Sequence, residues 1–308
     1  GVRPGTELIH TFAATGERPL AFRVSGLPPG LEVDPASGIV RGTAPATGRS
    51  GPVAPTASVP RRGRLRPATT ARAARGSTHM EHVEDAVAVV TGGASGIGRA
   101  LATSLLERGA AAVVLADVEK DALDLAVAEL STVGAGEVIG MPPDVTDRVA
   151  VEALADAAWD RFDGVQVVCL NAGVIAAGHA WEVTDDDWDW VLGVNVRGVA
   201  HGIRAFVPRL VEAGDPAHVL VTASMAGIVA APVSAAYVTS KFAALGLAES
   251  LHHDLGFVGA DHVAVSAICP GMVATRIGEG HRNRPAHLAA ATETDGAGPA
   301  PAGMRDLL

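Results

Sequence analysis

Lysine and tyrosine are nearly absent from this 308-residue chain, which has 22 arginines but only Lys120 and Lys241, and whose single tyrosine is Tyr237. Aromatic residues make up only 4% of it. No apolar run approaches the roughly 18 residues of a membrane span. No apolar stretch follows a charged N-terminus, as it does in a signal peptide. We therefore expect a soluble, cytoplasmic protein without membrane association.

Cysteine is also scarce, because Cys169 and Cys269 are the only two. Two thiols in a chain this long exclude a disulfide framework. Each ends a short apolar run, so we expect both to be buried core thiols. The adjacent pair His252 and His253 would point in different directions from a helix and could not chelate as an i, i+4 pair does. We expect no metal site.

Negative charge is almost missing from the N-terminal part of the chain. Residues 1–80 hold 11 arginines against four carboxylates, a balance of +7, and the whole chain carries −10. Residues 81–308 therefore carry −17. An acidic piece of this kind is a poor nucleic-acid binder, because binding phosphates needs clustered positive charge.

Residues 1–48 hold short β-prone pieces separated by Gly/Pro turns, and they resemble part of the immunoglobulin-like modules of bacterial surface proteins. We expect an incomplete β-prone segment there; a functional surface-binding module is the alternative. The Arg/Pro/Ala-rich residues 49–80 predict a disordered linker, with a nucleic-acid or targeting arm as the alternative. The run Gly76-Ser77-Thr78-His79-Met80 resembles a cloning scar, so Met80 is a candidate start of the natural protein.

From about residue 81 the pattern becomes regular, with short apolar runs alternating with segments of helical period. Such alternation predicts a doubly wound parallel α/β sheet covered on both faces. The expected strand order is 3-2-1-4-5-6. The expected strands are 86–91, 112–116, 137–141, 165–170, 218–223 and 262–268. The expected helices are 96–109, 118–131, 147–161, 185–212 and 233–256.

A glycine-rich turn, Thr91-Gly92-Gly93-Ala94-Ser95-Gly96-Ile97-Gly98, joins the first strand to the first helix. Glycines let the backbone approach a pyrophosphate, and the helix N-terminus offers free N–H groups. A structural tight turn is the alternative. Asp117 ends the second strand, where a carboxylate accepts both ribose hydroxyls of NAD and repels the 2′-phosphate of NADP. Glu119 adds to that repulsion, Lys120 weakens it, and a helix-capping role for Asp117 is the alternative. We expect NAD in preference to NADP.

The only tyrosine stands four residues before one of the two lysines, in Tyr237-Val238-Thr239-Ser240-Lys241. On a helix, positions i and i+4 share a face. A nearby ammonium favours the phenolate, so Lys241 is expected to lower the pKa of Tyr237 toward neutrality. A general acid/base needs such a pKa. A surface helix pair is the bland alternative.

Together these motifs resemble the short-chain dehydrogenase/reductases over about residues 86–280. The resemblance rests on the glycine turn, on Tyr237 with Lys241, and on four further pieces in the expected order: Asn171-Ala172-Gly173, Asn195, Ser224-Met225-Ala226-Gly227 and Pro270-Gly271. It implies a Rossmann fold and an NAD-dependent oxidoreductase acting on a secondary alcohol or ketone. The alternative is a dinucleotide-binding protein without turnover.

The resemblance also implies roles for single residues. Ser224 hydrogen-bonds the substrate oxygen, Tyr237 exchanges its proton, Lys241 assists Tyr237 and binds ribose hydroxyls, and Asn195 holds a water in the proton relay. The expected cofactor contacts beyond the glycine turn are Asp117, Asp144, Val145, Asn171, Ala172, Gly173, Pro270, Gly271, Val273 and Thr275. Helix capping is the alternative for Asp144 and Thr275, and packing is the expected role of Trp188 and Trp190.

After Pro270-Gly271 the family carries a lid, another helix and a seventh strand, whereas residues 284–303 here are rich in Gly, Ala and Pro. We therefore expect the enzyme domain, residues 81–308, to lack the last strand. Residues Ile175, Met225, Val229 and Pro232 indicate an apolar pocket for a small alcohol or ketone. With a completed C-terminus, the resemblance implies a homodimer or homotetramer.

Overall fold

The computed structural model describes five strands within residues 7–58, and then residue 80 and residues 82–288. By its internal contacts the chain divides into two compact units, Gly1–Ala73 and Ala74–Leu308. The boundary lies before the position expected from the sequence, residue 81. One reason is that Met80 is half-buried and packs against the core of the second unit.

The first unit holds two small antiparallel sheets. Strands β1 (Glu7–Thr11), β4 (Ile39–Thr43) and β3 (Leu31–Val33) pair in the order β1-β4-β3, and β2 (Ala21–Ser25) pairs with β5 (Ala54–Ser58). Strand β5 lies within residues 49–80, the segment for which the composition predicted a linker.

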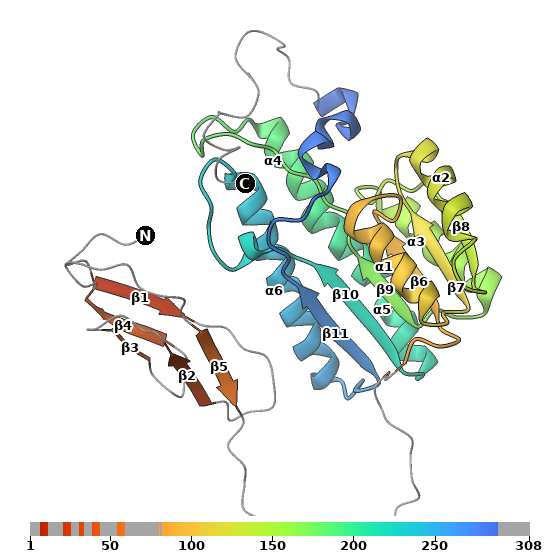
Figure 1. Cartoon of the computed structure of the whole chain (residues 1–308), viewed down its shortest axis with the longest axis horizontal. Helices are drawn as coiled ribbons and strands as arrows, with labels where there is room; N and C mark the ends of the chain where they lie inside the picture. Colours follow the sequence, from red (N-terminus) through yellow and green to blue (C-terminus); the bar gives the residue numbers. More distant parts are fainter. Residues whose placement is uncertain are drawn as a thin grey trace, which may run out of the picture. The chain divides into compact units, whose positions relative to one another are not determined.

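The second unit is a parallel sheet of six described strands in the order β11-β10-β9-β6-β7-β8 (Figure 1). This confirms the predicted fold and the strand order 3-2-1-4-5-6. The strands are β6 (Val87–Thr91), β7 (Ala112–Ala116), β8 (Glu137–Met141), β9 (Val167–Leu170), β10 (Ala217–Thr222) and β11 (Val263–Ile268).

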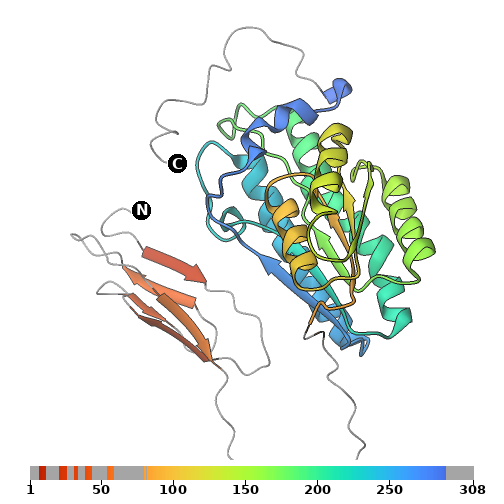
Figure 2. The same cartoon turned by 45° about the vertical axis from the view of Figure 1, so that its right-hand side comes forward.

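Helices cover both faces, as Figure 2 shows from a second direction. Alternate strand residues contribute to two separate cores, because successive side chains of a strand point to opposite faces. One core is closed by α3, α5 and α6, and the other by α1 and α2. The helices are α1 (Gly96–Glu107), α2 (Lys120–Leu130), α3 (Arg148–Phe162), α4 (Asp185–Leu192), α5 (Gly198–Ala213) and α6 (Ala235–Phe257).

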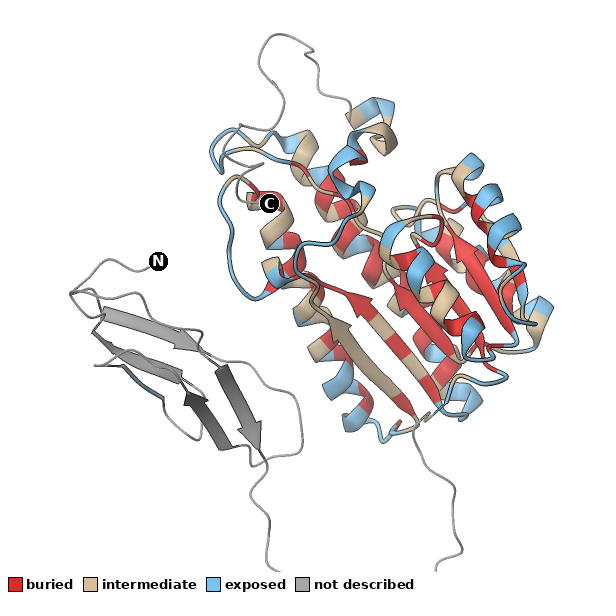
Figure 3. Ribbon diagram, viewed as in Figure 1, coloured by how far each residue is buried: buried red, intermediate tan, exposed pale blue. Residues whose placement is uncertain are grey.

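The central strands are the most deeply buried (Figure 3). Every residue of β6, β7 and β9 is buried, whereas most of β11 is half-buried. Uninterrupted burial is typical of parallel strands covered on both faces. The helices α1 and α2 contact β6, β7 and β8.

Two expectations from the sequence need correction, and a third concerns residues that the structure does not describe. The helix expected over 185–212 is three pieces, because a π-helical turn, η1 (Gly193–Arg197), separates α4 from α5. Cys169 is buried as predicted, but Cys269 is only half-buried, because it follows β11 at the edge strand. The proposed absence of a last strand falls on residues 289–308, which lie outside the described residues. Within the described ranges, none of the helices has both the length and the apolarity to cross a bilayer.

Candidate active site

The glycine turn brings backbone groups closer together than any side chain would allow. Gly92 and Gly96 adopt positive φ angles of 64° and 52°, where glycine carries no steric penalty. A Cβ on Gly98 would lie 2.1 Å from the carbonyl oxygen of Gly92 and 2.6 Å from Nδ2 of Asn171. Glycine at position 98 is therefore a packing requirement of this turn.

The turn leaves the N-terminus of α1 open. Its N-cap, Ser95, makes no capping hydrogen bond with its side chain, and the first turn holds no acidic residue. The first N–H groups of a helix lack intrahelical partners and carry partial positive charge. The start of α1 thus offers uncommitted donors to an anion, and a dinucleotide pyrophosphate fits this requirement.

Asp117 follows β7 and is held by two backbone donors. Its Oδ2 accepts from the N–H of Ala94 at 3.1 Å, and its Oδ1 accepts from the N–H of Glu119 at 3.0 Å. Burial raises the pKa of the Asp117 carboxyl, while these two hydrogen bonds act to lower it. Each oxygen keeps a free lone pair, which is what a ribose diol needs. The N-cap of α2 is Glu119, so Asp117 does not hold the helix-capping position considered as its alternative.

Glu119 is not the free negative charge that the sequence interpretation assumed. Arg282 donates to it through Nε at 3.0 Å and Nη2 at 2.6 Å, and Asn283 donates at 2.9 Å. The hydrogen bond from Arg282 is the main reason that the pKa of Glu119 is lowered. Residue 282 is 163 positions away in the chain, so no local pattern could have predicted this pair. We call residues 92–119 the glycine-turn end of the site.

Asn171 joins the carboxyl ends of three strands. Its Nδ2 donates to the carbonyl of Thr91 at 3.0 Å, and its Oδ1 accepts from Thr222 Oγ1 at 3.0 Å. Thr91 Oγ1 in turn accepts from the N–H groups of Asn171 and Ala172. These contacts hold the ends of β6, β9 and β10 in register beneath the site, at the edge where doubly wound sheets bind ligands.

Ser224 follows β10 and begins the 3₁₀ turn η2 (Met225–Gly227). Its Oγ accepts from the N–H of Ala226 at 3.1 Å, and Ser224 lines the same cavity as Tyr237 of α6. A Cβ on Gly227 would lie 2.6 Å from the carbonyl oxygen of Lys241. The turn and α6 are therefore packed closely, which fixes Ser224 against Tyr237. We call residues 224–241 the tyrosine end of the site.

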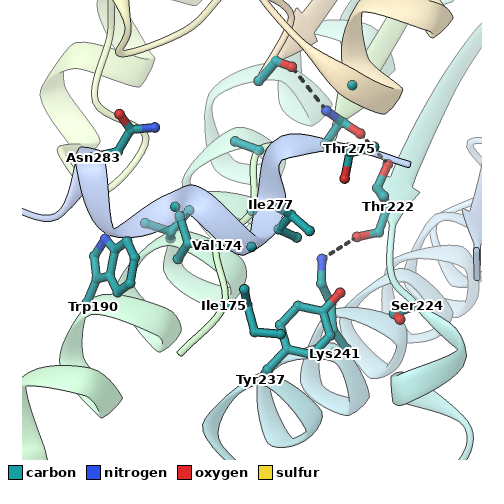
Figure 4. A pocket seen from close by; sticks show the side chains of 18 of the residues that line it. Val174, Ile175, Trp190, Thr222, Ser224, Tyr237, Lys241, Thr275, Ile277 and Asn283 are labelled. Carbon is teal, nitrogen blue, oxygen red and sulfur yellow. Dashed lines mark hydrogen bonds between the residues drawn. The ribbon is translucent and has the colours of Figure 1, made fainter. Parts of the chain in front are cut away.

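The predicted effect of Lys241 on Tyr237 is wrong in this structure. Burial raises the pKa of the Tyr237 phenol, and the hydrogen bond with Ser224 only partly opposes it. The Lys241 ammonium donates to the carbonyl of Thr222 at 2.9 Å and lies 5.7 Å from the centre of the tyrosine ring (Figure 4). Burial lowers the pKa of Lys241 to about 8. The helical spacing put the pair on one face, but it could not predict which oxygen the ammonium would contact.

Asn195 lies in the π-helical turn η1 and is almost completely buried. Its Oδ1 accepts from the N–H of Val174 at 2.8 Å, and its Nδ2 donates to the Val174 carbonyl and to Ser240 Oγ. A Cβ on Gly173 would lie 3.3 Å from Lys241 Nζ and 3.4 Å from Asn195 Oδ1. Glycine at position 173 thus leaves space beside both polar groups.

Neither Asp144 nor Thr275 makes a helix-capping hydrogen bond with its side chain, which was the alternative role considered for both. Asp144 accepts from the N–H and the hydroxyl of Thr146, whereas Asp147 caps α3. Thr275 precedes the 3₁₀ segment η3 (Arg276–Asn283) but makes no capping hydrogen bond with its side chain. Its Cγ2 lies 3.1 Å from the position of a Cβ on Gly96.

One cavity of about 1510 Å³ joins the two ends of the site. It brings together nearly all the residues expected from the sequence; Gly98 and Asn195 support its wall without lining it. The expected residues that line it are Gly92, Ser95, Gly96, Ile97, Asp117, Asp144, Val145, Asn171, Ala172, Gly173, Ser224, Tyr237, Lys241, Pro270, Gly271, Val273 and Thr275.

The sequence interpretation missed one wall of this cavity, which η3 and the 3₁₀ turn η4 (Ala286–Leu288) supply. We call residues 276–288 the strap. Ile277 of the strap lines the cavity together with Ile175 and Tyr237, and Figure 4 labels all three. Trp190, expected only to pack, is buried and also lines the cavity. The two strap arginines, Arg282 and Arg284, were the available signal in the sequence, but their spacing does not identify a partner.

Known proteins resemble this chain over the same region. The model of the short chain dehydrogenase family matches residues 86–286. The chain is 46% identical over 201 residues to 1-deoxy-11-beta-hydroxypentalenate dehydrogenase of Streptomyces exfoliatus, which covers 65% of this chain and 71% of that protein. It is 35% identical over 211 residues to 3beta-hydroxysteroid dehydrogenase 2 of Eggerthella lenta, covering 68% of this chain and 78% of that protein.

A solved structure of a short chain dehydrogenase/reductase from Burkholderia phymatum, in complex with NAD, has a TM-score of 0.68 with this chain. The two are 41% identical, and the match covers 74% of this chain and 78% of that chain. The chain therefore belongs to the short chain dehydrogenases and is an oxidoreductase that acts on CH–OH groups.

Proposed function

We propose that this protein transfers a hydride between NAD and an apolar secondary alcohol or ketone. The observation that carries the proposal is that one cavity holds both the Asp117 carboxylate and the Ser224–Tyr237 pair. A dinucleotide has its ribose diol at one end and its reacting ring at the other. A cavity with a diol acceptor and an acid/base at opposite ends suits such a molecule. The Burkholderia phymatum relative is described with NAD.

NAD, when bound, supplies the nicotinamide ring that accepts or donates the hydride. The open N-terminus of α1 would hold the pyrophosphate, and Asp117 would accept both adenosine ribose hydroxyls. Asp117 would also repel a 2′-phosphate through the negative charge of its carboxylate, which the two backbone donors favour and burial opposes. NAD is therefore the expected cofactor in preference to NADP.

In this proposal the proton is transferred at the tyrosine end of the site. Ser224 Oγ, already fixed by the N–H of Ala226, would hold the substrate oxygen beside the Tyr237 phenol. During oxidation the phenolate accepts the hydroxyl proton of the substrate, and during reduction the phenol donates a proton to the carbonyl oxygen. The Lys241 ammonium has two donors beyond its contact with Thr222. We propose that the water of the proton relay binds beside the Lys241 ammonium, which glycine at position 173 keeps clear of a neighbouring side chain.

The substrate side of the cavity is largely apolar. Its wall includes Val174, Ile175, Trp190, Val229, Ile277 and Leu288. Burial of apolar substrate surface in such a wall contributes roughly 25 cal/mol per Å². The two named relatives are dehydrogenases whose names specify hydroxyl groups on their substrates, a hydroxypentalenate and a hydroxysteroid. We propose the same class for this chain, a hydroxyl on an apolar skeleton.

The catalytic work belongs to residues 81–308, because the residues that line the cavity run from Gly92 to Leu288. Residues 1–48 and the linker that follows contribute no catalytic group in this proposal. As the family resemblance implies, we expect the enzyme to work as a homodimer or homotetramer when its C-terminus is completed.

The test is an NAD-reduction screen over apolar secondary alcohols, followed at 340 nm with NADP run in parallel. We expect turnover with NAD and slower turnover with NADP. In Asp117→Ala the difference between the two rates should be smaller. The rival function is a dinucleotide-binding protein without turnover. Tight NAD binding by calorimetry, with no reduction across the whole screen and no oxidation of NADH by matching ketones, would establish that rival instead.

A further inference from the structure

The strap is joined to the glycine-turn end by one ion pair at its centre. Arg282 Nη2 and Glu119 Oε1 are 2.6 Å apart, and their side chains are only 24% and 22% exposed. Arg282 also donates through Nη1 to the carbonyls of Arg276 and Glu279. An arginine that makes two parallel contacts with a carboxylate is held in a defined orientation. Both residues line the cavity.

This pair stands directly beside the acceptor proposed for the ribose. The N–H of Glu119 donates to Asp117 Oδ1 at 3.0 Å, and both Glu119 and Arg282 act electrostatically on the Asp117 carboxyl, in opposite directions. A 2′-phosphate on the ribose would enter the same field. Two further cations near this pair are themselves paired, Arg276 with Glu279 at 3.0 Å and Lys120 with Asp124 at 2.6 Å.

We propose that Glu119 and Arg282 leave cofactor selectivity to Asp117, because each cancels the charge of the other beside the ribose site. The inference rests on the proposed function, because it assumes that the ribose binds at Asp117. With the pair intact, Asp117 alone discriminates against NADP. Removal of the Glu119 charge leaves Arg282 as a free phosphate ligand, whereas removal of the Arg282 charge leaves Glu119 as a second repelling carboxylate.

Single neutral variants therefore have opposite effects. The readout is the ratio of the dissociation constants of NADP and NAD, measured by calorimetry on the whole chain without substrate. Glu119→Gln should lower this ratio about tenfold, and Arg282→Gln should raise it about tenfold. Changes of this size are expected when one unpaired charge lies close to the 2′-phosphate. The double variant restores neutrality and should return the ratio to near that of the unmodified chain.

Arg284 provides a matched control, because it lies in the same strap and carries the same charge. It pairs with Asp187 at 2.5 Å and lies over the ring of Trp190. Arg284→Gln loosens the strap and removes one positive charge, but away from Asp117. It should leave the NADP to NAD ratio unchanged. Thermal unfolding of each variant shows whether the strap residues are also needed for folding.

The outcomes separate this inference from the proposed function. If Glu119→Gln and Arg282→Gln shift the ratio in the same direction or not at all, or if Arg284→Gln shifts it as much as Arg282→Gln, the selectivity role is refuted. If instead the unmodified chain binds NADP more tightly and Asp117→Ala changes nothing, the ribose assignment itself has failed. Should one single variant not fold, the other single variant still tests the selectivity role by the direction of its shift, and Asp117→Ala still tests the ribose assignment.

Discussion

The two ends of the cavity are held in place by different means. At the glycine-turn end, Asp117 is fixed by two backbone N–H groups, one from Ala94 in the turn after β6 and one from Glu119. At the tyrosine end, the Lys241 side chain of α6 donates to the carbonyl of Thr222 at the end of β10. The first arrangement depends on the backbone path of the loops after β6 and β7, and the second on how α6 packs against β10.

This difference decides where substitutions act. A change of side chain at the tyrosine end should alter the chemistry while the backbone path that binds a dinucleotide stays intact. A Cβ added at the glycine-turn end should damage binding and folding together. The two ends are therefore separable by experiment, and the variants below test each in turn.

Tyr237→Phe should have the largest effect. It keeps the ring and its packing but removes the only phenol in the chain. Turnover should fall by roughly 10²–10⁴-fold, as expected for the loss of a general acid/base. NAD affinity should be unchanged, because the glycine-turn end is untouched. Steady-state rates and calorimetry measure the two quantities. Near-normal turnover would move the proton transfer to another group.

Gly98→Ala should damage the other end. The added Cβ would lie 2.1 Å from the Gly92 carbonyl oxygen, and overpacking of this kind costs typically about 1–3 kcal/mol of stability. NAD affinity should fall at least about tenfold, because the turn must open. Gly246→Ala in α6 is the matched control, since nothing lies within 4 Å of its Cβ. If Gly98→Ala and Gly246→Ala bound NAD equally well, the turn would not need a glycine there.

The sequence predicted most of the sheet and most of the cavity lining. The strands were predictable because parallel strands buried on both faces read as short apolar runs. Their order followed from the alternation of strands and helices, and the ligand edge followed from the order. Single residues such as Asp117 and Ser224 could be placed because each follows a strand end.

What could not be predicted depends on long-range contacts. The pairing of Glu119 with Arg282 joins residues 163 positions apart, and charge patterning along the chain does not identify such partners. The π-helical turn at Gly193–Arg197 was also missed, since its five residues do not disturb the apolar periodicity enough to mark a break. The pKa of Tyr237 depended on burial and on the direction of the Lys241 ammonium, neither of which follows from i, i+4 spacing.

Lys241→Met tests whether burial of the charged Lys241 ammonium at the tyrosine end destabilises the folded state. The folded-state pKa of Lys241 is lowered to about 8 from 10.5. Between these values the unfolded chain keeps a proton that the folded chain has released, so the free energy of unfolding rises with pH there. Below about pH 8 Lys241 is charged in both the folded and the unfolded state, so its contribution to the free energy of unfolding does not change with pH. Lys241→Met should lose this rise, which should amount to roughly 1–2 kcal/mol by pH 9.5.

Urea unfolding at pH 7 and pH 9.5 measures this difference. Lys120→Met is the control, because its ammonium is exposed and pairs with Asp124 on the surface of α2. It should show the same change between the two pH values as the unmodified chain. Identical pH dependence in Lys241→Met would mean that the buried ammonium keeps its proton over this range.

Val233→Gly should have the smallest effect on the free energy of unfolding. Unlike most truncations of cavity-lining residues, it should not lower this free energy. Val233 has a φ angle of 59°, where a β-branched residue is a conformational outlier. Its carbonyl accepts from the N–H of Gly178 at 3.0 Å, and the next residue, Ser234, forms a parallel bridge with Gly178. These contacts hold the strained backbone four residues before Tyr237. Left-handed geometry costs an L-residue roughly 1–2 kcal/mol, which glycine removes.

Val229→Gly is the matched control, because Val229 lines the same cavity and its φ angle is not positive. Glycine at position 229 adds unfolded-state entropy and relieves nothing, so it should destabilise the protein by about 1 kcal/mol. At position 233 the relief of strain offsets that entropy, and the free energy of unfolding should stay level or rise. The two variants should therefore differ by about 1 kcal/mol in urea unfolding. Equal losses at both positions would show that the loop before α6 holds Val233 without strain. The tyrosine end would then be positioned by packing alone.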